Sequence, residues 1–502
     1  MQAVLTSAEV RAREADAERG GVCLELLMER AGSALADHAH QLCAPHGAVH
    51  LLCGPGNNGG DGLVAARRLR ELGRRVFVEL VSEGRELEGL AAKARVELLA
   101  QGLRLERLST EPRPGDVIVD ALFGVGLNRA PSGPFEEAIE RLARWRAAGA
   151  LLVAADIPSG VQSDSGALFT PCVTADVTVT FGSLKVGMAL EPGAGRCGRV
   201  IVADLGLPPD SSARLHLLDE PAAKSWIPRR EAISNKGTYG HLLVIAGSRG
   251  KSGAAAMAGM AALRAGVGLV TIATAPEVAA QVLSHAPELM ALELPSQTAL
   301  GLQTLEALRP LLAKVTAVVV GPGIAVGEET AAFLGGLLEA SSLPCLLDAD
   351  ALNAISGKLE TLARAEGPVV LTPHPGEMSR LAGVSTAEIQ AARLDHARAF
   401  AQRHRIHLVL KGARTLVASP DGQVFINPTG NPGMATAGTG DILSGICGAL
   451  LAQGLQPVKA ACAAVYVHGL AGDMMAQQWG QMGLVATDLL AGLGRVWSGW
   501  GR

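Results

Sequence analysis

The sequence predicts an α/β protein of two domains, each built on a parallel β-sheet. Short apolar segments alternate with helical segments along most of the 502 residues, and this alternation restarts once near the middle. Glycine-rich turns follow several of the apolar segments, and the chain holds 61 glycines with only 3% aromatic residues. Strands that alternate with helices form parallel sheets with helices on both faces. A chain of this length is expected to hold two or more domains.

The composition is that of a globular protein without a strongly charged surface. The chain is 48% hydrophobic and 18% charged, with a net charge of −4. It therefore predicts neither nucleic acid nor membrane as a partner. Its eight cysteines are scattered without a CxxC pair, which favours a reducing, cytoplasmic location over a disulfide framework or a zinc site. No signal peptide or membrane span is expected, and the protein is expected to form a homo-oligomer.

The first region contains the elements of one α/β domain. Thr6 and Glu9 form a capping box that opens a charged helix. Strands are expected at residues 49–53, 75–81, 116–122, 150–155, 176–181 and 199–204, with helices at 23–38, 63–72 and 135–147.

A proline-rich segment separates this region from the second. Residues 207–230 have prolines at 208, 209, 221 and 228 and no sustained periodicity, so they are interpreted as a linker between domains 1–218 and 222–502. Strands are then expected at 241–246, 269–273, 317–320, 345–348, 369–371 and 407–410, a hairpin at 415–427, and helices at 253–265, 442–451, 458–478 and 488–496.

Four loops of the first region follow predicted strands, where open α/β sheets bind ligands. They are residues 54–62, 123–129, 156–160 and 182–187. Oxygen-bearing side chains in or beside these loops could hold a hard cation; they are Asn57, Asn58, Asp61, Asp120 and Ser159. Asp156, before a Pro-Ser-Gly turn, is a candidate acid or base, and Lys185 could neutralise charge nearby. Each of these residues could instead be an ordinary turn residue.

The motifs GPGNNGGDG, FGVGLNR, DIPSG and GSLKVG resemble the NAD(P)H-hydrate epimerase family over roughly residues 1–215. The resemblance implies a Rossmann-like three-layer α/β/α domain that interconverts the R and S hydrates of NADH and NADPH. It implies that the hydrate is bound by Asn57, Asn58, Gly59, Gly60, Asp61, Gly124, Val125, Gly126, Leu127, Asn128, Arg129, Ala130 and Asp156. It further implies a potassium ion held by Asn58, Asp120 and Ser159.

Residues 431–445, NPGMATAGTGDILSG, are the most informative stretch of the second region. Glycines allow close backbone approach to a ligand, and the N-terminus of the helix expected at 442–451 favours an anion. Asp441 is the carboxylate in this stretch and is a candidate proton acceptor for a hydroxyl beside a phosphate. The alternative is a glycine-rich turn in which Asp441 caps the helix.

Other strand ends of this region carry KGTYG, GPG, LTPHPGE and VLKG, and together with LDADAL they resemble the NAD(P)H-hydrate dehydratase family of the ribokinase-like superfamily over roughly residues 232–495. The resemblance implies that Ala255, Gly323, His374 and Asp441 contact the hydrate. It implies that the nucleotide is held by Lys411, Gly412, Ala413, Arg414, Thr415, Asn431, Gly438, Thr439 and Gly440. A histidine before a proline can equally be structural, and residues 248–252, SRGKS, have no assigned role.

The leading hypothesis is a bifunctional repair enzyme for hydrated NADH and NADPH. ADP or ATP would phosphorylate the C6 hydroxyl of the S hydrate, Asp441 would accept its proton, and magnesium would shield the nucleotide phosphates. One alternative is a small-molecule hydroxyl kinase of the same fold; another is a first domain that binds without catalysis.

Overall fold

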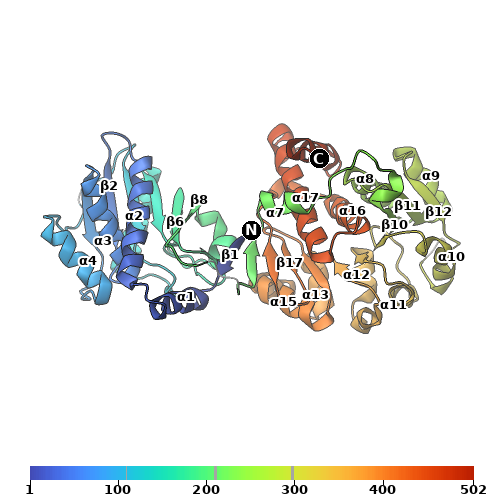
Figure 1. Ribbon diagram of the computed structural model, residues 1–502, viewed down its shortest axis with the longest axis horizontal. Helices are drawn as coiled ribbons and strands as arrows, with labels where there is room; N and C mark the ends of the chain where they lie inside the picture. Colours follow the sequence, from blue (N-terminus) through green and yellow to red (C-terminus); the bar gives the residue numbers. More distant parts are fainter. Residues whose placement is uncertain (109, 209–211, 296–298) are drawn as a thin grey trace. The chain divides into compact units, whose positions relative to one another are not determined.

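The protein is described by a computed structural model of residues 1–108, 110–208, 212–295 and 299–502. It divides into two compact units, Gln2–Ala213 and Arg214–Arg502 with Met1. Each unit has its own β-sheet and its own helices (Figure 1). The predicted α/β class is confirmed for both.

The first unit is a three-layer α/β/α domain. Its sheet is parallel throughout, and its strand order is β3 (Arg75–Leu80), β2 (Ala48–Cys53), β4 (Val117–Ala121), β5 (Leu151–Ala155), β6 (Val177–Phe181) and β8 (Arg199–Ala203). One face packs against α2 (Leu24–Leu42), α3 (Asn57–Glu71) and α4 (Gly89–Ala100), and the other against α5 (Pro134–Ala147). Successive strand residues serve opposite faces: Leu51 belongs to the first core and Leu52 to the second.

A second, small strand pair lies beside the main sheet of this unit. The strand β1 (Gln2–Leu5) runs parallel to β7 (Leu184–Lys185), with Leu5 opposite Lys185. The helix α1 (Ser7–Arg19) begins at Thr6 with the predicted capping box, in which the Thr6 hydroxyl accepts from the Glu9 N–H at 3.2 Å. The short elements α6 (Val186–Ala189) and η1 (Ala194–Arg196) complete the unit.

The sheet of the second unit is larger and mixed. Its strand order is β12 (Met290–Glu293), β11 (Leu269–Thr274), β10 (His241–Ile245), β13 (Ala317–Val320), β14 (Cys345–Leu347), β15 (Val369–Leu371), β16 (His407–Leu410), β17 (Leu416–Ala418), β18 (Val424–Ile426) and β9 (Leu215–Leu217). Neighbouring strands from β12 to β16 are parallel. The antiparallel pair β17–β18 is the predicted hairpin.

Helices cover this sheet as the alternating pattern predicts. The main core includes residues of α8 (Ser252–Arg264), α9 (Pro276–His285), α16 (Thr439–Ala452), α17 (Pro457–Trp479) and α18 (Asp488–Trp500). The other helices and short turns are α7 (Glu220–Trp226), η2 (Lys236–Tyr239), α10 (Leu302–Leu312), α11 (Thr330–Ala340), α12 (Asp350–Ile355), η3 (Leu359–Arg364), α13 (Pro375–Ala382), α14 (Thr386–Ala391), α15 (Arg393–His404) and η4 (Pro432–Met434). Within the described residues, none of the helices combines the length and apolar character that crossing a bilayer requires.

Two expectations about local structure are wrong. Residues 207–230, interpreted as a linker without a strand or helix, contain β9 and α7, although the division between the two units after Ala213 lies within them. Residues 209–211 of this segment lie outside the described residues. Both elements are too short to show a period in the sequence. Asp219 caps α7 by accepting from the Ala222 N–H at 2.9 Å, and Ala223 is fully buried in the core of the second unit.

The glycine-rich segment after β2 is also not a loop as far as residue 62, because α3 already begins at Asn57. Glycine and asparagine favour loops by intrinsic propensity, but packing overrides that preference here. A Cβ added to Gly59 would lie 1.8 Å from the Gly54 carbonyl oxygen, so this turn of helix touches the backbone of the preceding loop. The residues Asn57, Asn58 and Asp61 therefore lie on the first turns of a helix.

Candidate active sites

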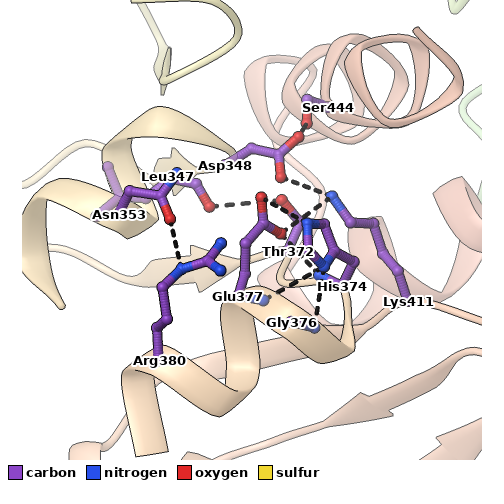
Figure 2. A network of polar contacts seen from close by, with 10 residues as sticks. All are labelled: Leu347, Asp348, Asn353, Thr372, His374, Gly376, Glu377, Arg380, Lys411 and Ser444. Atoms are coloured by element: carbon purple, nitrogen blue, oxygen red, sulfur yellow. Dashed lines mark hydrogen bonds and ion pairs between the residues drawn. The ribbon is translucent and has the colours of Figure 1, made fainter. Parts of the chain in front are cut away.

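A network of charged groups joins strand ends in the second unit (Figure 2). Asp348 directly follows β14, and Lys411 directly follows β16. The Lys411 ammonium donates to Asp348 Oδ1 at 2.8 Å, and the Ser444 hydroxyl of α16 donates to Asp348 Oδ2 at 2.6 Å. The Glu377 carboxylate lies 3.8 Å from the same ammonium. Burial alone would lower the pKa of Lys411, but the carboxylates of Asp348 and Glu377 outweigh it and the pKa is raised.

Asp441 lies beside this network on the first turn of α16. A Cβ added to the preceding Gly440 would lie 3.4 Å from the Lys411 Nζ and 3.9 Å from Asp348 Oδ2. Burial first, and then the negative charge of Asp348, raise the pKa of Asp441 to about 6, while Lys411 opposes them. A carboxylate with this pKa is ionised at neutral pH and is a stronger base than an exposed one, as a proton acceptor requires.

The N-terminus of α16 presents backbone donors next to Asp441. Gly438 precedes the helix with φ 93°, a conformation that favours glycine. The first helical hydrogen bond runs from the Ile442 N–H to the Gly438 carbonyl at 3.2 Å, so the N–H groups of residues 439–441 have no acceptor within the helix. The Thr439 hydroxyl donates to the Met434 and Thr436 carbonyls, both at 3.1 Å, and holds the preceding loop in place.

Residues not identified from the sequence hold the two predicted nucleotide loops. Arg393 of α15 donates to the carbonyls of Leu410, Lys411 and Ala413, the first two at 3.2 Å. Asp473 of α17 accepts from the Gly430 N–H at 2.9 Å and from the Asn431 side-chain amide at 2.8 Å. Thr415 also turns its hydroxyl inward, onto the Gly412 carbonyl at 2.9 Å. The contacts of Arg393 and Asp473 join residues that are distant in sequence, so no local motif shows them.

The residues predicted to contact the hydrate differ in what they offer. Gly323, after β13, has φ 65°, and a Cβ there would lie 3.0 Å from the Ala254 Cβ. His374 caps α13: its Nδ1 accepts from the Gly376 N–H at 3.0 Å, which leaves Nε2 as the protonated nitrogen, 3.4 Å from Glu377 Oε1. The structural and the ligand-binding interpretations of His374 therefore both have support, since Nδ1 caps the helix and Nε2 carries a proton that a ligand can accept. Ala255 is fully buried in the core, so its methyl group is not presented to a ligand.

In the first unit, Asp156 and Lys185 form a buried pair at the end of the sheet. Asp156 follows β5 with φ 64°, an unusual conformation for a residue with a side chain. Its Oδ1 accepts from the Lys185 ammonium and from the Phe181 N–H at 3.1 Å. Lys185 also donates to the Thr180 hydroxyl at 2.9 Å. The pair places a carboxylate of fixed geometry at the carboxyl edge of the sheet.

The negative charge of Asp156 also affects the pKa of two further carboxyl groups. Burial and then Asp156 raise the pKa of Asp61 on α3. They also raise the pKa of Glu14 on α1. Glu14 was not identified from the sequence, because its helix lies outside every strand-end motif. Lys185 lowers both pKa values, so it compensates part of the negative charge.

Two of the three residues predicted to bind a cation are bonded to each other. Asp120, at the end of β4, accepts from the Ser159 N–H at 2.8 Å and from the Ser159 hydroxyl at 2.7 Å. Burial raises the pKa of Asp120 to about 6, and the bonds from Ser159 oppose it. The Asn58 side-chain oxygen is buried and has no hydrogen-bond partner among the described residues. Asn58 lies beside Gly124, and the neighbouring Phe123 N–H donates to the Ser159 hydroxyl at 3.1 Å. A buried oxygen without a partner, a carboxylate and a hydroxyl are ligand types that suit a hard cation such as potassium.

The loops after β2 and β4 lie at the strand-order reversal of the first sheet, where open α/β sheets bind ligands. Strand order reverses between these strands, since β3 lies on one side of β2 and β4 on the other. A Cβ added to Gly54 would lie 2.0 Å from the Leu122 carbonyl oxygen, and one added to Gly124 would lie 3.3 Å from the Asn58 Cβ. The structure therefore brings Asn58 beside Gly124, and the partly exposed loop 125–130 continues from there.

The fold and these sites define the class of protein. The first unit is a Rossmann-like α/β/α domain with two loops at its strand-order reversal, and the second is a ribokinase-like α/β domain with a carboxylate at a helix N-terminus. Residues 242–494 match the family model described as NAD(P)H-hydrate dehydratase, and residues 24–187 match the one described as YjeF-related protein N-terminus.

Relatives match both units together. The chain is 42% identical to the bifunctional NAD(P)H-hydrate repair enzyme Nnr of Moorella thermoacetica, over 88% of this chain and 86% of the relative. It is 39% identical to the enzyme of the same name from Escherichia coli, over 95% and 90%. A solved ribokinase-like superfamily protein from Enterococcus faecalis is 26% identical with a TM-score of 0.50, covering 58% of this chain and 99% of its own. The chain belongs to the family of bifunctional NAD(P)H-hydrate repair enzymes.

Proposed function

We propose that the second unit converts the S hydrates of NADH and NADPH back to the dihydronicotinamides with ADP or ATP as phosphoryl donor. The observation that carries this proposal is the position of Asp441, a carboxylate with a raised pKa at a helix N-terminus beside Lys411 and Asp348. The same site therefore holds a base that can accept a hydroxyl proton and N–H donors that can stabilise a phosphoryl group.

The chemistry proceeds in two steps. Asp441 accepts the proton of the C6 hydroxyl while the hydroxyl oxygen attacks the terminal phosphorus of the nucleotide. With ADP as the donor, AMP is the leaving group. Hydroxide is a poor leaving group, whereas phosphate is a good one. The ring nitrogen lone pair then expels phosphate from C6, and loss of a C5 proton restores the C5=C6 double bond. The N–H groups of residues 439–441 and the Lys411 ammonium stabilise the charge of the migrating phosphoryl group.

The substrates are held on either side of Asp441. The loop of Lys411, Gly412, Ala413, Arg414 and Thr415 binds the nucleotide, together with Asn431, Gly438, Thr439 and Gly440. Gly323 and the Nε2–H of His374 bind the hydrate, and Ala255 supports the hydrate pocket through its packing. Support comes from the arrangement of these loops at one sheet edge.

The first unit interconverts the R and S hydrates. Asp156 acts as acid or base at the hydrate, and Lys185 holds it in position through a buried ion pair. Residues 57–61 and 124–130 bind the dinucleotide at the strand-order reversal between β2 and β4. A first unit that supplies the S form completes the work of the second, since neither activity alone clears a mixed pool.

Two cations accompany these sites. Potassium is held by Asn58, Asp120 and Ser159 and supplies positive charge at the edge of the epimerase site. In the described residues there is no group of three His, Cys, Asp or Glu side chains arranged to hold a metal. The second unit therefore fits a magnesium ion carried mainly by the nucleotide phosphates. We further infer a cytoplasmic location, which the scattered free cysteines support, and a homo-oligomer.

One experiment tests both activities. The purified protein is incubated with chemically prepared NADH hydrate and either ADP or ATP, while absorbance near 340 nm and the R to S ratio are followed. Recovery of NADH with one nucleotide, and equilibration of the two hydrates without any nucleotide, are expected. Phosphorylated product without NADH would instead indicate a small-molecule kinase, and hydrates that keep their ratio would indicate a first unit that only binds.

A further inference from the structure

The segment 248–252, to which the sequence gives no role, lies at the strand-order reversal of the second sheet. The chain runs from β10 to β11 on one side and later to β13 on the other side of β10. Ligands bind open α/β sheets at such a point. The Gly247 N–H donates to the Pro322 carbonyl at 2.8 Å, so the loop after β10 is joined to the loop after β13.

Lys251 is the last residue before α8 and lies in the loop after β10 at this reversal. A Cβ added to Gly323 would be 3.0 Å from the Lys251 Cβ and 3.1 Å from its carbonyl oxygen. A small pocket beside it is lined in part by Gly247, Ser248 and Ile324, residues that neighbour Lys251 and Gly323 along the chain. The lysine therefore stands directly beside the glycine that is proposed to contact the hydrate.

The Lys251 side chain forms a weak and replaceable ion pair. Its ammonium lies 2.9 Å from Asp350 Oδ2, and the side chain is 53% exposed. Exposed pairs of this kind contribute little to stability, so the ammonium can exchange Asp350 for a phosphate at small cost. Asp350 in turn lies near enough to Asp441 to contribute to its raised pKa, after burial and Asp348.

The nucleotide loops lie on the other side of the sheet centre. Lys411 follows β16, which is separated from β10 by β13, β14 and β15. With neighbouring strands about 4.8 Å apart, the ends of β10 and β16 are roughly 19 Å apart. Both ammonium groups reach the chain after β14, where they pair with Asp350 and Asp348. Lys251 comes from the β10 side, beside Gly323, and Lys411 from the β16 side, beside Gly440, so each can serve a different substrate.

We propose that Lys251 binds a phosphate group of the dinucleotide hydrate and so selects phosphate-bearing hydrates over uncharged ones. This inference rests on the dehydratase function proposed above and adds a specificity residue to it. The hydrate carries a diphosphate at a distance from the reacting ring, and a lysine ammonium is a suitable partner for such a group.

Steady-state dehydration by the whole protein tests the proposal with two probes, the S hydrate of NADH and the S hydrate of the phosphate-free reduced nicotinamide riboside. Lys251→Ala should raise the KM for NADH hydrate about 10- to 100-fold, the value of one charge-assisted hydrogen bond. The kcat, the KM for ADP and all parameters for the riboside hydrate should stay unchanged. Lys251→Arg should recover most of the affinity.

Lys314→Ala is the matched control, because Lys314 is exposed and precedes β13 at the opposite edge of the sheet. An unchanged KM for NADH hydrate in Lys251→Ala would overturn the proposal. An increased KM for ADP would assign the lysine to the nucleotide instead, and an equal loss with the riboside hydrate would show a general structural effect. A wild-type protein without dehydration would refute the proposed function, and this inference with it.

Discussion

Replacement of Asp441 by asparagine separates its role as a base from its role in packing. Asn has nearly the same size, so α16 and the network around Asp348 should remain intact. The change removes the proton acceptor, and loss of a general base typically reduces a rate by about 10²- to 10⁴-fold. Dehydration should fall by that factor, while epimerisation in the other unit should continue at the wild-type rate.

The raised pKa of Asp441 adds a quantitative test. Because the pKa is about 6 instead of 3.8, the base is lost as the pH falls through about 6. At pH 5 about one tenth of the carboxyl groups are ionised, so kcat/KM should fall about tenfold from its plateau. A carboxyl group with the ordinary pKa would remain more than about nine-tenths ionised at that pH and would show almost no loss.

The assay is recovery of absorbance near 340 nm at saturating ADP, measured from about pH 5 to pH 8. The acid limb should be present in the wild type and absent in Asp441→Asn. Asp395→Asn is the control, since Asp395 is exposed on α15. Dehydration at the wild-type rate in Asp441→Asn, or an acid limb that survives the substitution, would refute the assignment of Asp441 as the base.

Other variants test the remaining sites. Asp120→Ala should weaken hydrate binding in the epimerase and abolish its response to potassium, with dehydration unchanged; epimerisation that ignores both this change and replacement of potassium by lithium would exclude a functional cation site. Arg393→Met removes three bonds to the nucleotide loop, so the KM for ADP should rise at least tenfold while the KM for hydrate does not. Fragments 2–213 and 214–502 should each fold, the first equilibrating the hydrates and the second repairing only the S form; fragment 222–502, which lacks β9 and the Asp219 cap, should melt at a lower temperature.

The sequence predicts the parts of the molecule that local patterns determine. Buried parallel strands are apolar runs, and the strand-end motifs mark the carboxyl edge of each sheet, so Lys411 and Asp441 could be expected near one another. The carboxylate of Asp348 between them was not expected. Local patterns do not predict β1, because its four residues form a strand only by pairing with β7. Nor do they show that α3 begins at Asn57, since a contact with Gly54 decides it.

Supporting residues are hidden from the sequence for a related reason. Arg393 and Asp473 hold the loops proposed to bind the nucleotide from helices that are distant along the chain, and neither belongs to a motif. The ion pair of Lys251 with Asp350 joins residues 99 positions apart. Side chains that position a loop are specified by the packing of helices on the sheet, which a pattern of one segment cannot show.

The two units use a buried lysine in different ways, and the difference fits their proposed chemistry. In the first unit Lys185 bonds directly to Asp156 and so fixes the position of that carboxylate. In the second unit Lys411 bonds to Asp348 instead, and Asp348 together with burial keeps the pKa of Asp441 raised. Because Lys411 neutralises the neighbour and not the base itself, Asp441 remains free to accept a proton. The same ammonium still lies close enough to the α16 N-terminus to stabilise a phosphoryl group, so one lysine serves both the base and the transferred group.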